Sequence, residues 1–209
     1  MKKGIWFFGM VFFALLSITT ISSCDKDDDD DPIENNCDLN TEQEEGLLYM
    51  REEEKLARDV YNHLYGKWNL NVFKNIAKSE QEHMDALLAE VDVCKFDDSV
   101  LPEDGKFNNS HIQELYDALI AKGDISLKDA LEVGATIEDV DIFDLDNFST
   151  KTENETLLGI YSKLTCGSRN HMRAFIRQLE NIGITYTPQF IGQEQFDSIL
   201  DGDHEQCGH

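Results

Sequence analysis

The stretch FKNIAKSEQEHMDAL, residues 73–87, limits the fold most strongly, because it sets two polar side chains in an apolar helical stripe. Phe73, Ile76 and Leu87 follow the alternating three- and four-residue steps of a buried helix face. Glu80 and His83, three residues apart, fall on that same face. Burying a carboxylate and an imidazole is costly unless other groups compensate them. The stretch therefore predicts a core helix whose polar pair meets polar groups of neighbouring helices.

The N-terminus predicts export. Lys2 and Lys3 precede an apolar run at residues 5–16, and small polar residues lead to Cys24, as in a secretory signal. Small residues directly before Cys24 favour a lipoprotein signal peptide, residues 1–23, after which Cys24 is lipidated. An uncleaved anchor or a plain signal is the alternative. We expect a lipoprotein of the cell envelope, at the outer membrane or cell surface, held to the membrane by the lipid on Cys24.

Residues 24–40 have the composition of an acidic, disordered tether, because DKDDDDDPIENN has no apolar periodicity. The segment resembles the export tag of some Gram-negative surface lipoproteins. Loss of Lys2 and Lys3 with the signal peptide changes the net charge from −24 to −26. Such a charge argues against nucleic acid as a partner.

From Thr41 onwards the pattern is that of an all-α domain over residues 41–190. Long amphipathic segments are predicted at 41–65, 73–90, 126–145 and 152–181, the first and last with capping boxes at Thr41 and Thr152. A loop at 92–108 and a short helix at 111–121 would form a crossover. Residues 191–209 read as a short helix, near 194–200, and a polar tail.

Each long segment carries polar residues in its apolar stripe, and the first hairpin brings three of them to one level. With a turn near Trp68, Glu54 lies 14 residues before it, and Glu80 and His83 lie 12 and 15 after it. At a rise of about 1.5 Å per residue, all three side chains lie at about the same distance from the turn along the hairpin. Glu52 and Glu53 lie off the stripe and are expected to be solvated, and Tyr61 is expected to pack with its hydroxyl satisfied.

Four blocks of the sequence resemble a prokaryotic ferritin-like family of unknown function, within the ferritin and rubrerythrin superfamily. They are EEEKLARDVY (52–61), SEQEHMDAL (79–87), VGATIEDVDIFDL (133–145) and GSRNHMRAF (167–175). The resemblance implies a ferritin-like four-helix bundle with a crossover helix. It also implies a centre of two metal ions, iron first and manganese or zinc as alternatives. The implied ligands are Glu54, Glu80, His83, Glu138, Asp141 and His171, with Glu80 and Glu138 as bridging candidates.

The second half of this centre departs from the superfamily pattern. Ser168 stands where a Glu-x-x-His motif would place a carboxylate before His171, so that carboxylate is either missing or supplied by Asp141. Counted in residues from the expected turn of the second hairpin, Glu138 and His171 also lie at different levels. Either an irregular connector corrects the depth or Glu132 replaces Glu138.

Three functions remain open at this point. The first is a di-iron oxidoreductase acting on oxygen or peroxide, the second a metal-binding protein without turnover, and the third an acidic interaction lipoprotein. A homodimer is compatible with all three. The stripe positions shared by four helices favour the first two.

Four cysteines besides Cys24 allow two disulfides in an exported chain. Cys37 and Cys94 flank the ends of the first hairpin, where the chain ends adjoin, so we predict a Cys37–Cys94 bridge. His204, Cys207 and His209 read as solvated tail residues rather than as metal ligands.

Overall fold

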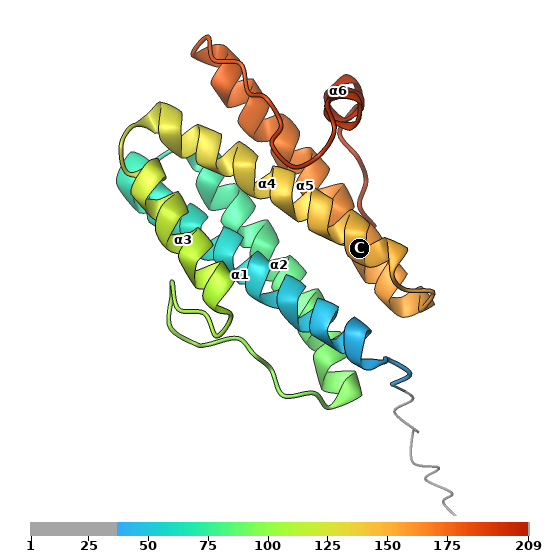
Figure 1. The fold of residues 1–209 in the computed structure, drawn as a ribbon. Coiled ribbons are helices and arrows are strands. Elements are labelled where there is room, and N and C mark those ends of the chain that lie inside the picture. Colours follow the sequence, from blue (N-terminus) through green and yellow to red (C-terminus); the bar gives the residue numbers. More distant parts are fainter. Residues whose placement is uncertain (1–36, 209) are drawn as a thin grey trace, which may run out of the picture. The chain divides into compact units, whose positions relative to one another are not determined.

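The computed structural model describes residues 37–208, which form six helices and no strand (Figure 1). The helices are α1 (Thr41–Trp68), α2 (Asn71–Cys94), α3 (Ser110–Gly123), α4 (Leu127–Thr150), α5 (Glu155–Asn181) and α6 (Gln193–Asp201). The all-helical class is confirmed for this part of the chain. The expected signal peptide, Cys24 and most of the acidic tether lie outside the described residues. Within them, no helix is long and apolar enough to cross a membrane.

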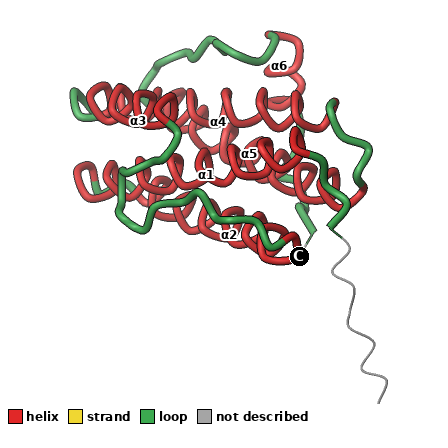
Figure 2. Tube along the Cα trace, turned by 60° about the horizontal axis from the view of Figure 1, so that its bottom comes forward, coloured by secondary structure: helices red, strands yellow, loops and turns green. Residues whose placement is uncertain are grey.

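The four long helices pack as two pairs. α1 lies against α2 and α4 against α5, and the pairs meet where α1 contacts α4 and α2 contacts α5. α3 runs across α1 and α4 (Figures 1 and 2). Two apolar clusters fill the interior: one includes Leu47, Leu87 and Leu164, and the other includes Phe73 and Phe175. The polar positions of the helical stripes fall between these clusters.

The loop at residues 95–109 covers the outer face of α1, which corrects one expectation. Glu52 is buried rather than solvated, because its carboxylate accepts the backbone N–H of Asn109 at 3.0 Å. Arg51 donates to Asp98, and the fully buried Lys55 donates to the carbonyl oxygen of Glu103. The charged residues of this face therefore anchor the loop.

The helix starts differ slightly from the expected capping boxes. α1 is capped by Asn40, whose side chain accepts the backbone N–H of Gln43, and not by Thr41. α5 is capped by Asn154, two residues after the expected Thr152. Asparagine is among the strongest N-cap residues, so it takes the position where one stands beside a threonine. α4 is capped by Ser126, whose hydroxyl oxygen accepts the backbone N–H of Asp129.

Two disulfides fasten the chain ends to this frame. The predicted Cys37–Cys94 bridge is confirmed, and Cys166 pairs with Cys207. Cys207 is therefore not available as a metal ligand. The segment after α5 is held by Asp139, whose carboxylate accepts the backbone N–H of Gln189 and Ile191 and the hydroxyl of Tyr186.

Candidate metal centre

The interior between the two apolar clusters holds five of the six residues implied as metal ligands. They come from all four long helices and form two groups whose ligand atoms lie within 4.8 Å of one another. The first group is Glu54, Glu80 and His83, and the second is Glu80, Glu138 and His171. Glu80 belongs to both groups.

In the first group, His83 turns its Nδ1 towards two carboxylates. This nitrogen lies 2.8 Å from Glu80 Oε2 and 3.1 Å from Glu54 Oε2. Both glutamates are only 2 % exposed. Glu54, Glu80 and His83 were expected at one level of the hairpin, and these distances show that they lie together.

In the second group, His171 turns its Nδ1 towards the other oxygen of Glu80, at 3.0 Å, and towards Glu138 Oε2, at 3.4 Å. The two imidazole rings stack with their centroids 5.7 Å apart. One carboxylate therefore stands between two imidazoles, each with a second carboxylate of its own. Glu138 reaches only His171, so the geometry favours Glu80 alone as the shared carboxylate.

Three neighbouring residues hold these side chains in place. Ser79 Oγ lies 3.0 Å from His171 Nε2, which leaves Nδ1 to face the carboxylates. Tyr61 donates its hydroxyl hydrogen bond to Glu138 Oε1, so its hydroxyl is satisfied as expected. Gly167 lies against His83: a Cβ at this position would be 2.5 Å from the imidazole Nε2. A larger residue at 167 would push the ring away.

Asp141 lies beside the centre without joining either group. The Ser168 hydroxyl donates to Asp141 Oδ2, while Asp141 Oδ1 is buried and has no hydrogen-bond partner among the described residues. Ser168 and Asp141 thus occupy the place of the expected missing carboxylate together. The alternative ligand Glu132 is wrong, because it forms ion pairs with Lys122 and Lys128 instead.

Glu53 is the residue that the sequence interpretation missed. It was expected to be solvated, yet it is 2 % exposed, and neither of its carboxylate oxygens has a hydrogen-bond partner within residues 37–208. Three successive glutamates at 52–54 allow only one to lie centrally in the stripe, and Glu53 is one position out of register. α4 covers that position, which the sequence of α1 alone does not indicate.

Burial and mutual charge shift the pKa values of the cluster strongly. Burial would lower the pKa of His171, but the carboxylates of Glu80 and Glu138 outweigh it and raise this pKa to about 10. His83 behaves alike, since Glu54 and Glu80 raise its pKa against the effect of burial. For Glu80, burial opposes the two imidazoles, which hold its pKa well below the usual range. The raised pKa values mean that protons compete with a cation for both imidazoles.

Among the remaining acids, burial dominates. It raises the pKa of Glu54 to about 7 even though His83 opposes the shift. It also raises the pKa of Glu53 and of Asp141, with the charges of neighbouring carboxylates adding to the effect. Removing these carboxylates from water is costly in the absence of a balancing cation.

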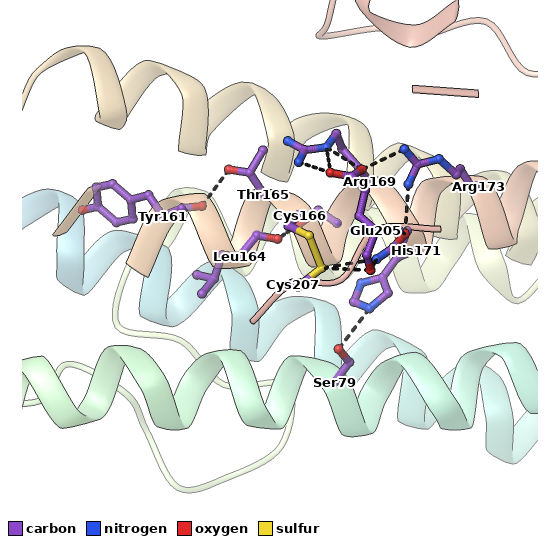
Figure 3. Close-up of a disulfide and its surroundings, with 12 residues drawn as sticks. Ser79, Tyr161, Leu164, Thr165, Cys166, Arg169, His171, Arg173, Glu205 and Cys207 are labelled. Carbon is purple, nitrogen blue, oxygen red and sulfur yellow. Dashed lines mark hydrogen bonds and ion pairs between the residues drawn. A yellow bond between two sulfur atoms is a disulfide. The ribbon is translucent and has the colours of Figure 1, made fainter. Parts of the chain in front are cut away.

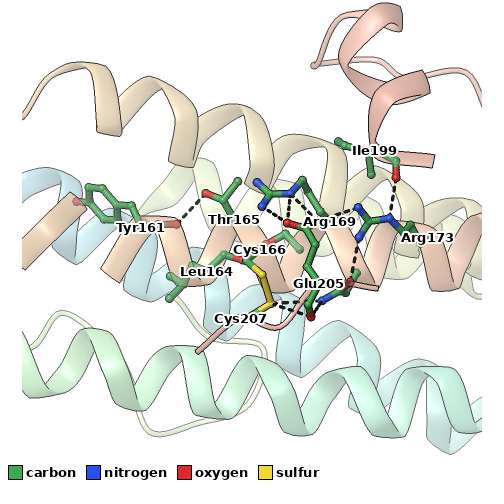
Figure 4. Close-up of polar contacts among 11 residues, drawn as sticks. Tyr161, Leu164, Thr165, Cys166, Arg169, Arg173, Ile199, Glu205 and Cys207 are labelled. Atoms are coloured by element: carbon green, nitrogen blue, oxygen red, sulfur yellow. Dashed lines mark hydrogen bonds and ion pairs between the residues drawn. A yellow bond between two sulfur atoms is a disulfide. The ribbon is translucent and has the colours of Figure 1, made fainter. Parts of the chain in front are cut away.

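The C-terminal tail is fastened to the helix that carries His171. Close to the Cys166–Cys207 disulfide, Glu205 accepts hydrogen bonds from Arg169 and Arg173 of α5 (Figure 3). Arg173 also donates to the carbonyl oxygen of Ile199 at the end of α6 (Figure 4). One side of α5 is therefore held by the tail, while His171 on the same helix reaches Ser79 (Figure 3).

The donor set fits a pair of cations held by carboxylates and imidazoles. Among the six residues implied as ligands, four buried atoms lack a hydrogen-bond partner within the described chain: Glu54 Oε1, Glu80 Oε1, Asp141 Oδ1 and His171 Nδ1. Glu80 Oε1 and His171 Nδ1 are 3.0 Å apart, yet they do not form a hydrogen bond with each other. Oxygen and imidazole nitrogen donors suit iron, manganese and zinc. A cation between these oxygen and nitrogen atoms would give them the partners that the described protein atoms do not supply.

Fold and site define a helical protein with two carboxylate–histidine groups that share one glutamate. The family described as "Uncharacterized protein domain (DUF2202)" matches residues 43–203, and the chain belongs to this family.

A close relative is known both in sequence and in structure. The chain is 52 % identical over 169 residues to "Uncharacterized protein MJ0754" of Methanocaldococcus jannaschii, an alignment that covers 80 % of this chain and 91 % of the relative. The crystal structure of hypothetical protein MJ0754 from Methanococcus jannaschii matches with a TM-score of 0.79 and covers 96 % of that chain. The two proteins share their fold, and neither printed name states an activity.

Proposed function

We propose that the protein is a ferritin-like four-helix bundle that binds two metal ions, iron in the first place, and uses them in redox chemistry with oxygen or peroxide. The single observation that carries this proposal is the sharing of Glu80 between two carboxylate–histidine groups. In di-iron carboxylate proteins, ligands project inward from the four helices of a bundle in this manner.

The charge of the interior supports a cation site over a structural hydrogen-bond network. Within the described residues, the carboxylates of Glu54, Glu80 and Glu138 form ion pairs only with the two histidines. Arg51 and Lys55 are the basic residues nearest to Glu54 in the sequence. They form ion pairs with Asp98 and Asp59 instead of with the centre. A network selected for stability would pair its buried oxygens, whereas this one leaves several without partners.

Each residue has a definite task in this proposal. Glu54 and His83 would hold one ion, Glu138 and His171 would hold the other, and Glu80 would be shared between them. Ser79 Oγ would accept a hydrogen bond from the Nε2–H of His171, which would keep Nδ1 available as the ligand atom. The Tyr61 hydroxyl donates to Glu138 and fixes the orientation of that carboxylate.

A bound iron pair would supply electrons for reduction of an oxidant. The apolar clusters on both sides of the centre limit the access of water. Metal binding without turnover is the alternative function for the same residues. Turnover of oxygen or peroxide by iron-loaded protein, absent from zinc-loaded protein, would separate the two.

Elemental analysis tests the metal centre. The full chain, produced with iron, manganese and zinc supplied, is expected to contain two metal ions per chain, and a chelator is expected to lower its melting temperature. His83→Ala should lose most of the metal and keep its helical circular dichroism. His63→Ala is the matched control, because it removes a half-exposed imidazole of α1 that pairs with Asp124. A chelator-insensitive wild type without stoichiometric metal would exclude the proposal.

We further propose that the protein is an envelope lipoprotein attached through Cys24. The support is the signal-like run before Cys24 and the two disulfides, which are typical of exported proteins. Cys24→Ala should release the protein from membranes or block its maturation. Unchanged detergent partition and mass would argue against lipidation.

A further inference from the structure

Glu53 is a buried carboxylate that the proposed metal centre does not use. It precedes the ligand Glu54, but a one-residue step on a helix turns its side chain away from the stripe that faces α2. Both of its oxygens are buried and lack hydrogen-bond partners within the described residues. A carboxylate left in this condition points to a ligand that satisfies it.

The surroundings of Glu53 are acidic and lie between α1 and α4. Burial raises the pKa of Glu53, and the charges of Asp144 and Glu54 add to this effect. Burial likewise raises the pKa of Asp141, with the charges of Glu54, Glu53 and Glu138 adding to it. Asp144 is partly exposed, and its carboxylate lies 3.5 Å from the hydroxyl of Tyr49. Positive side chains occur near Asp144, but none forms an ion pair with it among the described residues.

These side chains form a series from solvent to the centre. On α4, Asp144, Asp141 and Glu138 follow at steps of three residues, about 4.5 Å apart along the helix axis, and only Asp144 is partly exposed. On α1, Tyr49 and Glu53 are four residues apart on one face. Tyr49 and Asp144 are thus partly exposed, Glu53 and Asp141 are buried, and Glu54 and Glu138 belong to the centre.

We propose that Glu53 and Asp144 form an ancillary divalent-cation site, from which cations pass to the two-metal centre. The site rests on the proposed function, since it supplies that centre. Carboxylate oxygens suit divalent cations of the first transition row, and Asp144 gives solvent access to the otherwise buried Glu53. The unpartnered oxygens of Glu53 supply the observation that the acidic cluster alone would not.

The experiment follows the rate of loading in the full chain, with Co(II) as a visible probe. Stopped-flow absorbance would compare metal-free wild type with Glu53→Gln, which keeps the shape and removes the charge. Glu53→Gln is expected to slow loading at least about tenfold, the lower end of the gain that a focused charge gives to association. Its final occupancy should remain two ions per chain, because Glu53 is not a ligand of the centre.

Two further variants complete the test. Glu45→Gln removes an exposed carboxylate two turns away on α1 and should load at the wild-type rate, which controls for net charge. Asp144→Asn, at a partly exposed position, should slow loading as Glu53→Gln does, and it provides the test if Glu53→Gln fails to fold.

The outcomes separate the two proposals. Wild-type loading rates in both variants would overturn the ancillary site and leave the two-metal centre intact. Loss of one of the two ions at equilibrium in Glu53→Gln would make Glu53 a ligand of the centre and would also overturn it. A wild type that binds no Co(II) would remove the metal centre itself and the ancillary site with it.

Discussion

Gly167 provides a sharp test of where His83 lies. Ordinary van der Waals contact begins near 3.4 Å, whereas a Cβ at residue 167 would lie 2.5 Å from Nε2 of His83 and 2.6 Å from its Cε1. The imidazole of Gly167→Ala must therefore retreat by about 0.9 Å, since α5 is fixed by its packing on α4 and α2.

This displacement is large compared with the tolerance of a metal site. Ligand distances are held to about 0.2 Å, so a shift of the ring moves Nδ1 out of the position it shares with Glu54 and Glu80. We expect Gly167→Ala to lower metal affinity by about 10- to 100-fold, the range found when the support of a ligand is removed. That loss corresponds to about 1.4–2.7 kcal/mol.

The matched control is Gly159→Ala on the same helix. Gly159 is exposed, and a Cβ there meets no atom within 4 Å. Alanine in a helix interior is more stable than glycine by about 0.5–1 kcal/mol, so this variant should melt about 1–4 °C higher. Its metal affinity should not change.

Competition titrations against a chromophoric chelator would measure both affinities in the full chain. We expect the metal affinity of Gly167→Ala to be lowered and that of Gly159→Ala to be unchanged. Equal metal affinity in the two variants would refute the assignment of His83 as a ligand, because the imidazole could then move without consequence.

Three further predictions concern the hydrogen bonds, the disulfide and the protons of the site. Ser79→Ala should reduce metal affinity about 10-fold or more by freeing the His171 ring, which the same titration would show, with no effect expected if His171 is only a packing residue. Cys166→Ser with Cys207→Ser should cost about 4 kcal/mol of unfolding free energy for a 41-residue separation, measured by denaturant unfolding; an unchanged midpoint would contradict a formed bridge. Metal affinity should fall as the pH is lowered below about 10, by about tenfold per unit for each proton displaced, because the pKa of His171 is raised to about 10 and protons compete with the cation. A pH-independent affinity would exclude His171 as a ligand.

The long helices were predictable from the sequence because their apolar periodicity is strong. Each predicted long segment overlaps one helix of the structure, and counting residues from the first turn correctly placed Glu54 beside Glu80 and His83. The Cys37–Cys94 bridge followed from the same hairpin. Local pattern and short connections were sufficient for this half of the structure.

The second hairpin was harder because its level depends on the connector. α4 runs on to Thr150, five residues beyond its expected end, and α5 starts only at Glu155. The turn therefore lies later in the chain than expected, which brings Glu138 to His171 without any need for Glu132. Helix ends are set by capping and tertiary contacts that a periodic pattern does not encode.

Buried charges were the other failure, for a related physical reason. Glu52 and Glu53 read as surface residues because α1 alone offers no partner for them. The loop at 95–109 covers the first, and the second is buried within reach of the charge of Asp144 on α4; both neighbours are distant in sequence. Polarity predicts exposure only where no other segment of the chain supplies a cover.

The count of carboxylates connects the departure at Ser168 with the role proposed for Glu53. Two divalent cations carry four positive charges, and Glu54, Glu80, Glu138 and Asp141 supply four negative ones beside two neutral imidazoles. In the proposed centre, Asp141, held by the hydroxyl of Ser168, would thus complete the charge balance that a glutamate at 168 would otherwise provide. Glu53 is then a fifth buried carboxylate for which the centre has no cation. Its burial in the same acidic surroundings is costly unless a further cation visits it, which is the condition that a loading site beside the centre would meet.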